Sequence, residues 1–217
     1  MPRDARTTRD RLLRAGARLF AAEGVDAART RDIVALAGQA NDSAITYHFG
    51  SRRGLLEAIL RAGVQRMEPA RTAALPGLAG ARLPAVVAAV VEPTAAELRT
   101  EEGRDFLRIV AQVSGHAGIR SHTVPAVIED TALAAQLALL ERHCLALLPK
   151  PVALERIAVV ISFLTTALAD RTGRLGAEGA REDDGTLLAH DAFVADLTAM
   201  LTAALSAPAA APHNRFA

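Results

Sequence analysis

Several kinds of residue are scarce in this sequence, and their scarcity excludes several classes of protein. The one cysteine, Cys144, cannot form an internal disulfide, which suits a reducing compartment. There is no tryptophan, and aromatic residues make up 3% of the 217, so stacking against a flat aromatic ligand is poorly provided for. The N-terminus lacks the apolar core of a signal peptide, and no apolar run reaches the roughly 20 residues of a membrane span. We expect a cytoplasmic protein with no membrane partner.

Patterns that carry catalysis or metal binding are also missing. Cys144 directly follows His143, and neighbouring side chains on a helix point apart. His116 and His122 lack the spacing and the supporting carboxylate of a metal site. There is no glycine-rich phosphate loop. We therefore predict no catalytic residue, no metal and no cofactor. An enzyme stays a minor alternative, which turnover of a substrate would support.

Apolar residues recur at helical spacing along nearly the whole chain, and no alternating strand pattern persists. With 51% hydrophobic and 23% charged residues, the composition is that of an ordinary globular protein. We predict an all-α fold. The first helix is expected to be capped by Thr7 or Thr8 and to stop at Gly24. Further helices are expected near 30–37, 42–48, 51–67 (capped by Ser51), 83–91, 106–113, 125–148, 154–169 and 186–205, with a polar loop over 171–185.

Charge is unevenly distributed, although the net charge is only +1. Residues 1–61 hold 11 arginines and seven acidic residues, a net +4, and the rest of the chain carries −3. This asymmetry indicates an anionic partner for the first third of the chain. A solvated basic face would give the same distribution.

The helix expected at 42–48 would have about two turns and two unlike sides. A helix this short is marginal alone, so its apolar side must pack on its neighbours. Two short helices joined by a glycine-containing turn, the second with a polar face, form the helix-turn-helix pattern, whose second helix fits the DNA major groove. A helical hairpin with a solvated face would show the same periodicity. The helical wheel separates Ile45, His48 and Phe49 from Ser43, Thr46 and Tyr47.

Three segments between residues 8 and 60 carry a more specific signal: TRDRLLRAGARLFAAEGVDA, TRDIVALAG and ITYHFGSRRGLLEAIL. In this order they resemble the N-terminal domain of the TetR family of bacterial transcriptional regulators. The resemblance implies a helix-turn-helix domain that binds double-stranded DNA. The rest of the chain is similar to the family only in architecture, as an all-helical ligand-binding and dimerisation domain. The resemblance implies a DNA-binding domain at 1–50 and a ligand-binding and dimerisation domain at 51–205, followed by a disordered tail at 206–217.

The resemblance also implies which residues contact DNA. The family contacts a phosphate and a base at the start of its second helix, and Arg52 stands where the family usually has a lysine near a phosphate. The DNA-binding residues expected on this basis are Thr30, Arg31, Ser43, Thr46, Tyr47, His48 and Arg52.

Two departures from the family pattern leave the base contacts open. The turn GQAND is one residue longer than is common, and Thr46 occupies a position that is often tyrosine. Asp42 either caps the recognition helix or accepts a hydrogen bond from a cytosine amino group, and we expect it to cap.

The last two expected helices are apolar on nearly all sides, which is more than one modest core requires. In the family such helices pair with their counterparts in a four-helix dimer interface, although an ordinary monomer core would also use them. The residues expected in a homodimer interface are Leu154, Ile157, Ile161, Leu164, Leu168, Val194, Leu197, Leu201 and Leu205.

The family's middle helices usually enclose an inducer pocket, and the scarcity of aromatic residues here favours a small apolar effector of aliphatic or acyl type. Each candidate could equally be plain core or surface. The expected pocket residues are Phe106, Ile109, Val110, Gln112, Val113, His116 and His143.

Taken together, these patterns predict a ligand-responsive repressor that binds a palindromic operator as a homodimer. The alternative is a constitutive dimeric DNA-binding regulator without an effector. Release of DNA on addition of a ligand would separate the two.

Overall fold

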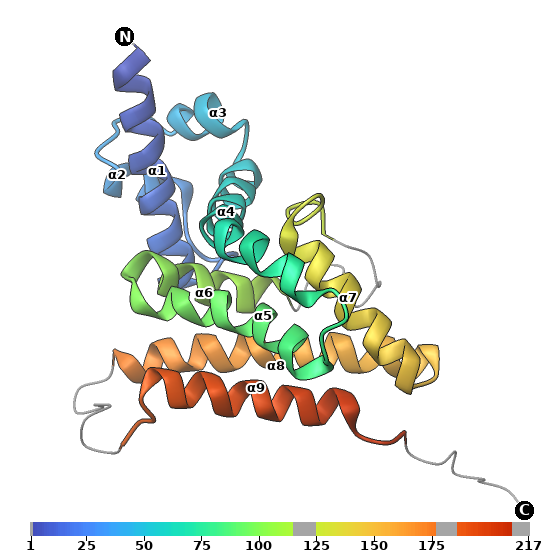
Figure 1. The fold of residues 1–217 in the computed structure, drawn as a ribbon. Coiled ribbons are helices and arrows are strands. Elements are labelled where there is room, and N and C mark those ends of the chain that lie inside the picture. Colours follow the sequence, from blue (N-terminus) through green and yellow to red (C-terminus); the bar gives the residue numbers. More distant parts are fainter. Residues whose placement is uncertain (1, 115–124, 177–185, 210–217) are drawn as a thin grey trace, which may run out of the picture.

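The computed structural model describes residues 2–114, 125–176 and 186–209, and within these ranges every regular element is helical (Figure 1). This confirms the all-α prediction. The elements are α1 Pro2–Glu23, α2 Thr30–Leu36, α3 Ser43–Phe49, α4 Arg52–Leu78, α5 Leu83–Ala96, the 3-10 turn η1 Glu97–Arg99, α6 Glu101–Ser114, α7 Ala132–Leu147, α8 Lys150–Leu175 and α9 His190–Ser206.

The helices α1, α2, α3 and the start of α4 enclose a small N-terminal core. Two glycines with positive φ make the chain reversals that this requires, Gly24 (φ 101°) after α1 and Gly38 (φ 68°) after α2. The Ser51 side chain caps α4 by accepting a hydrogen bond from the Gly54 N–H at 3.0 Å, as predicted. The fully buried side chains of this core include Leu12, Phe20, Ile33, Ile45, Leu55 and Ile109.

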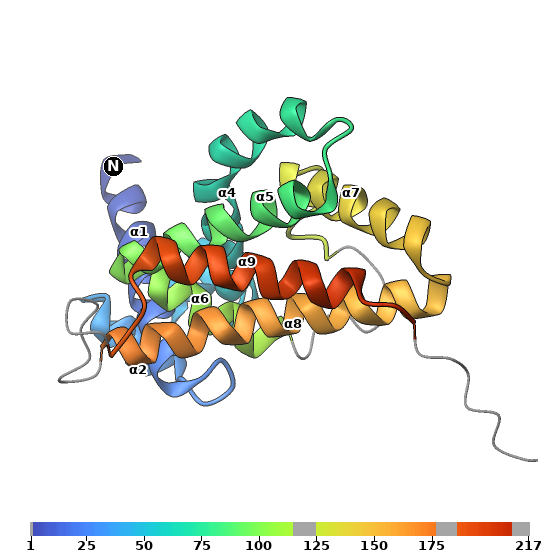
Figure 2. The same cartoon turned by 60° about the horizontal axis from the view of Figure 1, so that its bottom comes forward.

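The remaining helices form a bundle around a second, larger core. Figure 2 shows α8 and α9 lying side by side; α8 packs against α6, and α9 packs against α5. A buried arginine ties α4 to two other helices, because Arg71 donates to the Thr94 hydroxyl and to the Gln136 side-chain oxygen, each at 2.7 Å. Burial lowers the pKa of Arg71 to about 10.

The long helix α4 belongs to both cores, so the division between them is not a linker. Leu55 and Ile59 pack in the N-terminal core, whereas Met67 packs in the bundle. At Gly63 the backbone of α4 approaches α6 so closely that an added Cβ would lie 2.2 Å from the Phe106 ring. The first turns of α4 therefore belong to the same core as α1, α2 and α3.

Several helices are longer than predicted, and α1 and α8 are two of them. The first begins at Pro2, before the expected cap at Thr7 or Thr8. The other, α8, runs through part of the expected polar loop to Leu175. Tertiary contacts hold that last turn: Thr172 is buried and its hydroxyl accepts from Arg108 at 2.8 Å, and the Arg171 guanidinium lies 4.7 Å from the Phe193 ring. The rest of that loop lies outside the described residues.

Of the described helices, α8 also has the length and mean hydropathy, 1.8, that could cross a membrane. We had expected no such segment. Length and composition are weak evidence, because core helices of soluble proteins can pass the same test. Here α8 packs against α6, α9 and α7.

Candidate nucleic-acid interface

The short helix α3 has the two unlike sides that the sequence predicts. Ile45 is 1% exposed and points into the N-terminal core. On the opposite side Ser43 and Thr46 are exposed, and Tyr47 is 81% exposed. A helix of 7 residues is too short to be stable alone. The packing of its apolar side in the N-terminal core therefore determines where its outer face points.

Aromatic contacts fix the C-terminal half of α3. The guanidinium carbon of Arg9 on α1 lies 5.0 Å from the centre of the Phe49 ring, a cation–π geometry. The rings of Tyr47 and His48 meet edge to face, with centroids 4.8 Å apart. His48 is half-buried, so it lies at the edge of the exposed face rather than at its centre.

The recognition helix is capped by Asn41, not by Asp42, so our expectation for Asp42 was wrong. The Asn41 side-chain oxygen accepts from the Ser43 N–H at 2.9 Å, while Asp42 has helical dihedrals and makes no side-chain cap bond. A cap must be extended to reach back to the helix N–H groups, and the extra residue in the turn gives Asn41 that role. Asparagine is a strong cap residue, so the sequence did contain this signal.

The turn and α3 together border a concave surface of about 640 Å³. The turn itself closes through backbone bonds from Gly38 to Ala35 at 3.0 Å and from Gln39 to Val34 at 2.9 Å. The side chains along this surface are small or carry hydrogen-bonding groups, as contact with DNA requires. It is lined by Thr8, Gln39, Ala40, Asn41, Ser43, Ala44, Thr46, Tyr47 and His48.

At the start of α2, Thr30 is half-buried and Arg31 is exposed. The Arg31 side chain is held only by an exposed pair with the neighbouring Asp32, at 3.4 Å. Exposed ion pairs of this kind contribute little stability, so the guanidinium is free to exchange partners.

Arg52 lies where we did not expect it. Its guanidinium donates to the backbone carbonyls of Val25 and Ala28, the latter at 2.9 Å, and stacks 5.0 Å from the Phe20 ring centre. The side chain therefore fastens the α1–α2 loop to α4 instead of projecting outward. The next residue, Arg53, is the outward one: its side chain is 87% exposed and pairs with Glu57 at 2.9 Å.

Residues 12–59, which make up most of this domain, match the family model described as bacterial regulatory proteins, tetR family. This part of the chain is therefore a TetR-family DNA-binding domain, and the TetR family is one of bacterial regulatory proteins. No curated protein matches the chain significantly.

Several solved structures are similar to this chain along most of its length, at low sequence identity and with TM-scores below 0.5. The fatty acid degradation regulator FadR from Bacillus halodurans is 15% identical, with a TM-score of 0.49 over 89% of this chain and 97% of that one. GusR of Salmonella enterica is 21% identical, with a TM-score of 0.47 over 91% and 95%. AmtR of Mycobacterium smegmatis is 19% identical, with a TM-score of 0.45 over 93% and 87%. These likenesses are broad, and they assign no ligand to this chain.

The residues expected to line an effector pocket are divided among three environments. Ile109 is fully buried in the N-terminal core, and Phe106 is buried against Gly63. Gln112 joins α6 to the end of α1: its side-chain oxygen accepts from the Val25 N–H at 2.7 Å, and its amide donates to the Phe20 carbonyl at 3.3 Å. Of four cavities formed by the described residues, one includes Phe106, and the other described candidates line none of these four.

The other pocket candidates lie apart from these. Val113 packs against the N-terminal core and Val110 against the bundle core, and His143 is half-buried on α7. His116 lies outside the described residues. Next to His143, the Cys144 thiol is fully buried, and burial raises its pKa, so it is held in the unreactive protonated form.

Five residues expected in a dimer interface are instead buried within the chain's own bundle core: Leu164, Leu168, Leu197, Leu201 and Leu205. Both helices are apolar all round, so periodicity could not tell their inner side from their outer side. Leu154, Ile157, Ile161 and Val194 are half-buried. The large apolar side chains exposed on α8 and α9 are Val159, Phe163 and Met200.

Proposed function

We propose that this TetR-family protein is a ligand-responsive repressor that binds a palindromic operator as a homodimer. The observation that carries the proposal is the outer face of α3, where hydroxyl groups and an exposed tyrosine stand on a helix fixed from behind by Ile45. A helix of this size enters a major groove, which is about 12 Å wide. In this proposal the domain at 1–50 reads DNA, and the domain at 51–205 dimerises and binds the effector.

Within this proposal, Ser43 and Thr46 read bases, and Tyr47 contacts bases or backbone beside His48. Thr30 and Arg31, at the start of α2, make a second contact with the DNA. The phosphate contact expected of Arg52 is better supplied by Arg53, because the Arg53 side chain is exposed and the Arg52 guanidinium is occupied by two carbonyls. Phosphate contacts set the register of the helix in the groove, and base contacts set the sequence preference.

Since Asn41 supplies the cap, Asp42 is left exposed at the start of α3 with no side-chain hydrogen bond to that helix. We propose that it accepts from a cytosine amino group. Asp42→Ala, which removes the acceptor oxygens, should then lower the preference for cytosine at one position of each half-site by roughly 1–3 kcal/mol. Selection of bound DNA from a random pool, with both proteins in parallel, measures this; an unchanged preference excludes the contact.

The homodimer is proposed to form through the outer faces of α8 and α9. Val159 and Phe163 are exposed one turn apart on α8, and Met200 is exposed on α9. A groove of about 280 Å³ between the two helices, lined by Phe163, Phe193 and Met200, could receive side chains of a second copy. The outer face of α9 also carries Ala199 and Ala203, which allow close approach of another helix.

The palindrome follows from the dimer. Two recognition helices related by a two-fold axis read inverted half-sites about one helical turn apart or a multiple of it. Selection from random DNA with the full-length protein tests this directly. Recovery of an inverted repeat supports the proposal, and recovery of single half-sites without symmetry contradicts it.

An effector would act by binding one of two dimer states more tightly than the other. The alternative is a constitutive regulator without an effector. In both cases we propose that the protein acts in the cytoplasm. Screening small apolar acids for release of the selected operator separates the two. If no compound changes operator affinity, the constitutive alternative stands.

A further inference from the structure

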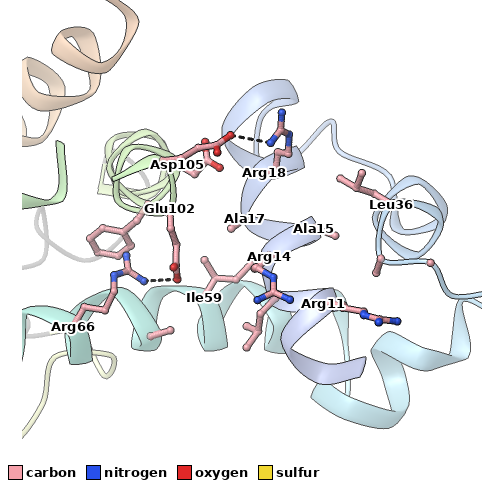
Figure 3. Close-up of a pocket in the computed structure, with 16 residues that line it drawn as sticks. Arg11, Arg14, Ala15, Ala17, Arg18, Leu36, Ile59, Arg66, Glu102 and Asp105 are labelled. Atoms are coloured by element: carbon pink, nitrogen blue, oxygen red, sulfur yellow. Dashed lines mark hydrogen bonds and ion pairs between the residues drawn. The ribbon is translucent and has the colours of Figure 1, made fainter. Parts of the chain in front are cut away.

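A groove of about 710 Å³ runs along α1, where it meets α2, α4 and α6 (Figure 3). Its volume is within the roughly 300–1,000 Å³ of small-molecule sites. Its walls come from both parts of the molecule, since α1 and α2 build the DNA-reading domain and α6 belongs to the bundle. The groove is separate from the concave surface beside α3.

The floor of the groove is apolar and built largely from small side chains. Ala15 and Ala17 of α1 are buried there, and Ile59 and Phe106 contribute the larger surfaces. On the wall formed by α2, Leu36 is 53% exposed, whereas Ile33 and Val34 of the same helix are buried. An exposed leucine beside a floor of alanines provides room and apolar surface for a hydrocarbon chain.

Charged side chains surround this floor, and most of them are paired. Arg18 on α1 pairs with Glu101 at 2.8 Å, and Arg66 on α4 pairs with Glu102 at 2.8 Å and also with Glu97. Figure 3 shows the Arg66–Glu102 pair spanning α4 and α6.

The remaining carboxylate of the groove, that of Asp105, pairs with an arginine that does not line the groove. Asp105 lies 3.5 Å from the Arg108 guanidinium, and burial raises the pKa of Asp105. Within the described residues this leaves two cations of the groove without an ion pair or a hydrogen bond, Arg11 and Arg14. They are three positions apart on α1, so their side chains lie on the same side of the helix. Figure 3 shows Arg14 reaching toward the middle of the groove, with Arg11 farther along α1.

We infer that this groove binds a small amphipathic anion, with its acid group held by Arg11 and Arg14 and its hydrocarbon chain lying over the alanines and Ile59. Two guanidinium groups on one side of a helix offer charge-assisted hydrogen bonds to a carboxylate. The arginines at the other end of the groove, Arg18 and Arg66, are already paired with carboxylates, which offset their charge. A cation of the same length would meet Arg11 and Arg14 and be repelled.

A ligand in this position touches both sides of the joint between the two domains. The other side of that joint is already fixed, because Gln112 is hydrogen-bonded to the end of α1 and Ile109 is buried in the N-terminal core. Occupancy of the open side changes the position of α1 against α6 only if the ligand prefers one arrangement. Binding itself is therefore the claim to test first, and it does not depend on the proposed operator.

The test is calorimetric titration of the full-length protein, without DNA, with sodium octanoate. Acetate controls for the acid group alone, and octylamine controls for the chain with the opposite charge. The site variant is Arg11→Gln with Arg14→Gln. Its matched control is Arg61→Gln with Arg142→Gln, which removes two exposed arginines that do not line the groove. Thermal melting of each variant verifies that the fold is kept.

Octanoate should bind the wild-type protein and the control variant equally. It should bind the Arg11/Arg14 variant at least about tenfold more weakly, since a hydrogen bond between charged groups is worth roughly 1.5–3 kcal/mol and 1.4 kcal/mol is tenfold. Ala62→Leu, which fills the half-buried part of the floor, should also weaken octanoate.

Three results would each overturn the inference. They are no octanoate binding to the wild-type protein at millimolar concentration, equal binding to both double variants, and octylamine binding as tightly as octanoate. Operator affinity is measured separately on the same proteins without ligand. A loss there would bear on the DNA-binding proposal and leave the titration result intact.

Discussion

The two domains differ in how far their sequence reveals which side of a helix faces outward. In the N-terminal domain, short helices carry polar residues on one side, and the exposed face of α3 is the predicted one. In the bundle, α8 and α9 are apolar on nearly all sides, and five leucines expected in a dimer interface are buried within the chain's own core. The sequence of a helix shows which of its sides is exposed only when one side is polar and the other apolar.

The largest effect is expected when a charge is placed on the buried side of α9 and, in a second variant, on its exposed side. Leu197 is 3% exposed within the bundle core, so Leu197→Asp buries an unpaired carboxylate. We expect a loss of about 4 kcal/mol or more, which is a large part of the roughly 5–15 kcal/mol by which a typical domain is stable. Circular dichroism and solubility measure this. The matched variant Met200→Asp, on the exposed side, should stay folded, and equal damage from both would show that the two sides are not distinct.

The next largest effect is expected from substitutions in the proposed dimer interface on α8. Val159→Asp with Phe163→Asp should leave a folded protein, because both side chains are exposed, but should give monomers in light scattering. Loss of the two-site linkage should weaken operator binding by roughly 10²- to 10⁴-fold while half-site binding is kept. A dimer that survives both substitutions would move the interface elsewhere, and a wild-type monomer at micromolar concentration would remove it.

Within the N-terminal domain, adjacent arginines should behave in opposite ways. Arg52→Ala removes hydrogen bonds to two carbonyls and the contact with Phe20, and should cost about 1–3 kcal/mol of folding stability, seen as a lower melting temperature. Arg53→Ala should leave melting unchanged. It should instead weaken operator and random DNA alike and lower the salt slope of binding by about one. The reverse pattern would restore Arg52 as the phosphate contact.

The smallest effect is expected on the outer face of α3. Thr46→Ala removes one hydroxyl from an exposed position and should cost roughly 1 kcal/mol on the operator only, with no change on random DNA. Binding isotherms on both DNAs at several salt concentrations distinguish this from a phosphate contact. Equal weakening on both DNAs would mean that the longer turn has rotated α3 and that Thr46 faces the backbone.

The sequence by itself determined the all-helical class, the glycine stops after α1 and α2, the Ser51 cap and the outward side of α3. Each of these is local: a cap, a left-handed turn or a two-sided helix depends on residues within a few positions of one another. The family motif is local as well, and it spans residues 12–59. These features were therefore predictable without knowledge of any neighbour.

Only the tertiary structure decided which partner each ambiguous side chain meets. Arg52 and Arg53 are adjacent and chemically identical, yet one faces two carbonyls and the other faces solvent. Arg71 is buried because Gln136 and Thr94, distant in sequence, supply its acceptors. The same holds for Leu197, whose side of α9 depends on where α5 and α8 lie. Such choices rest on contacts between remote segments, which hydrophobic periodicity along one helix does not contain.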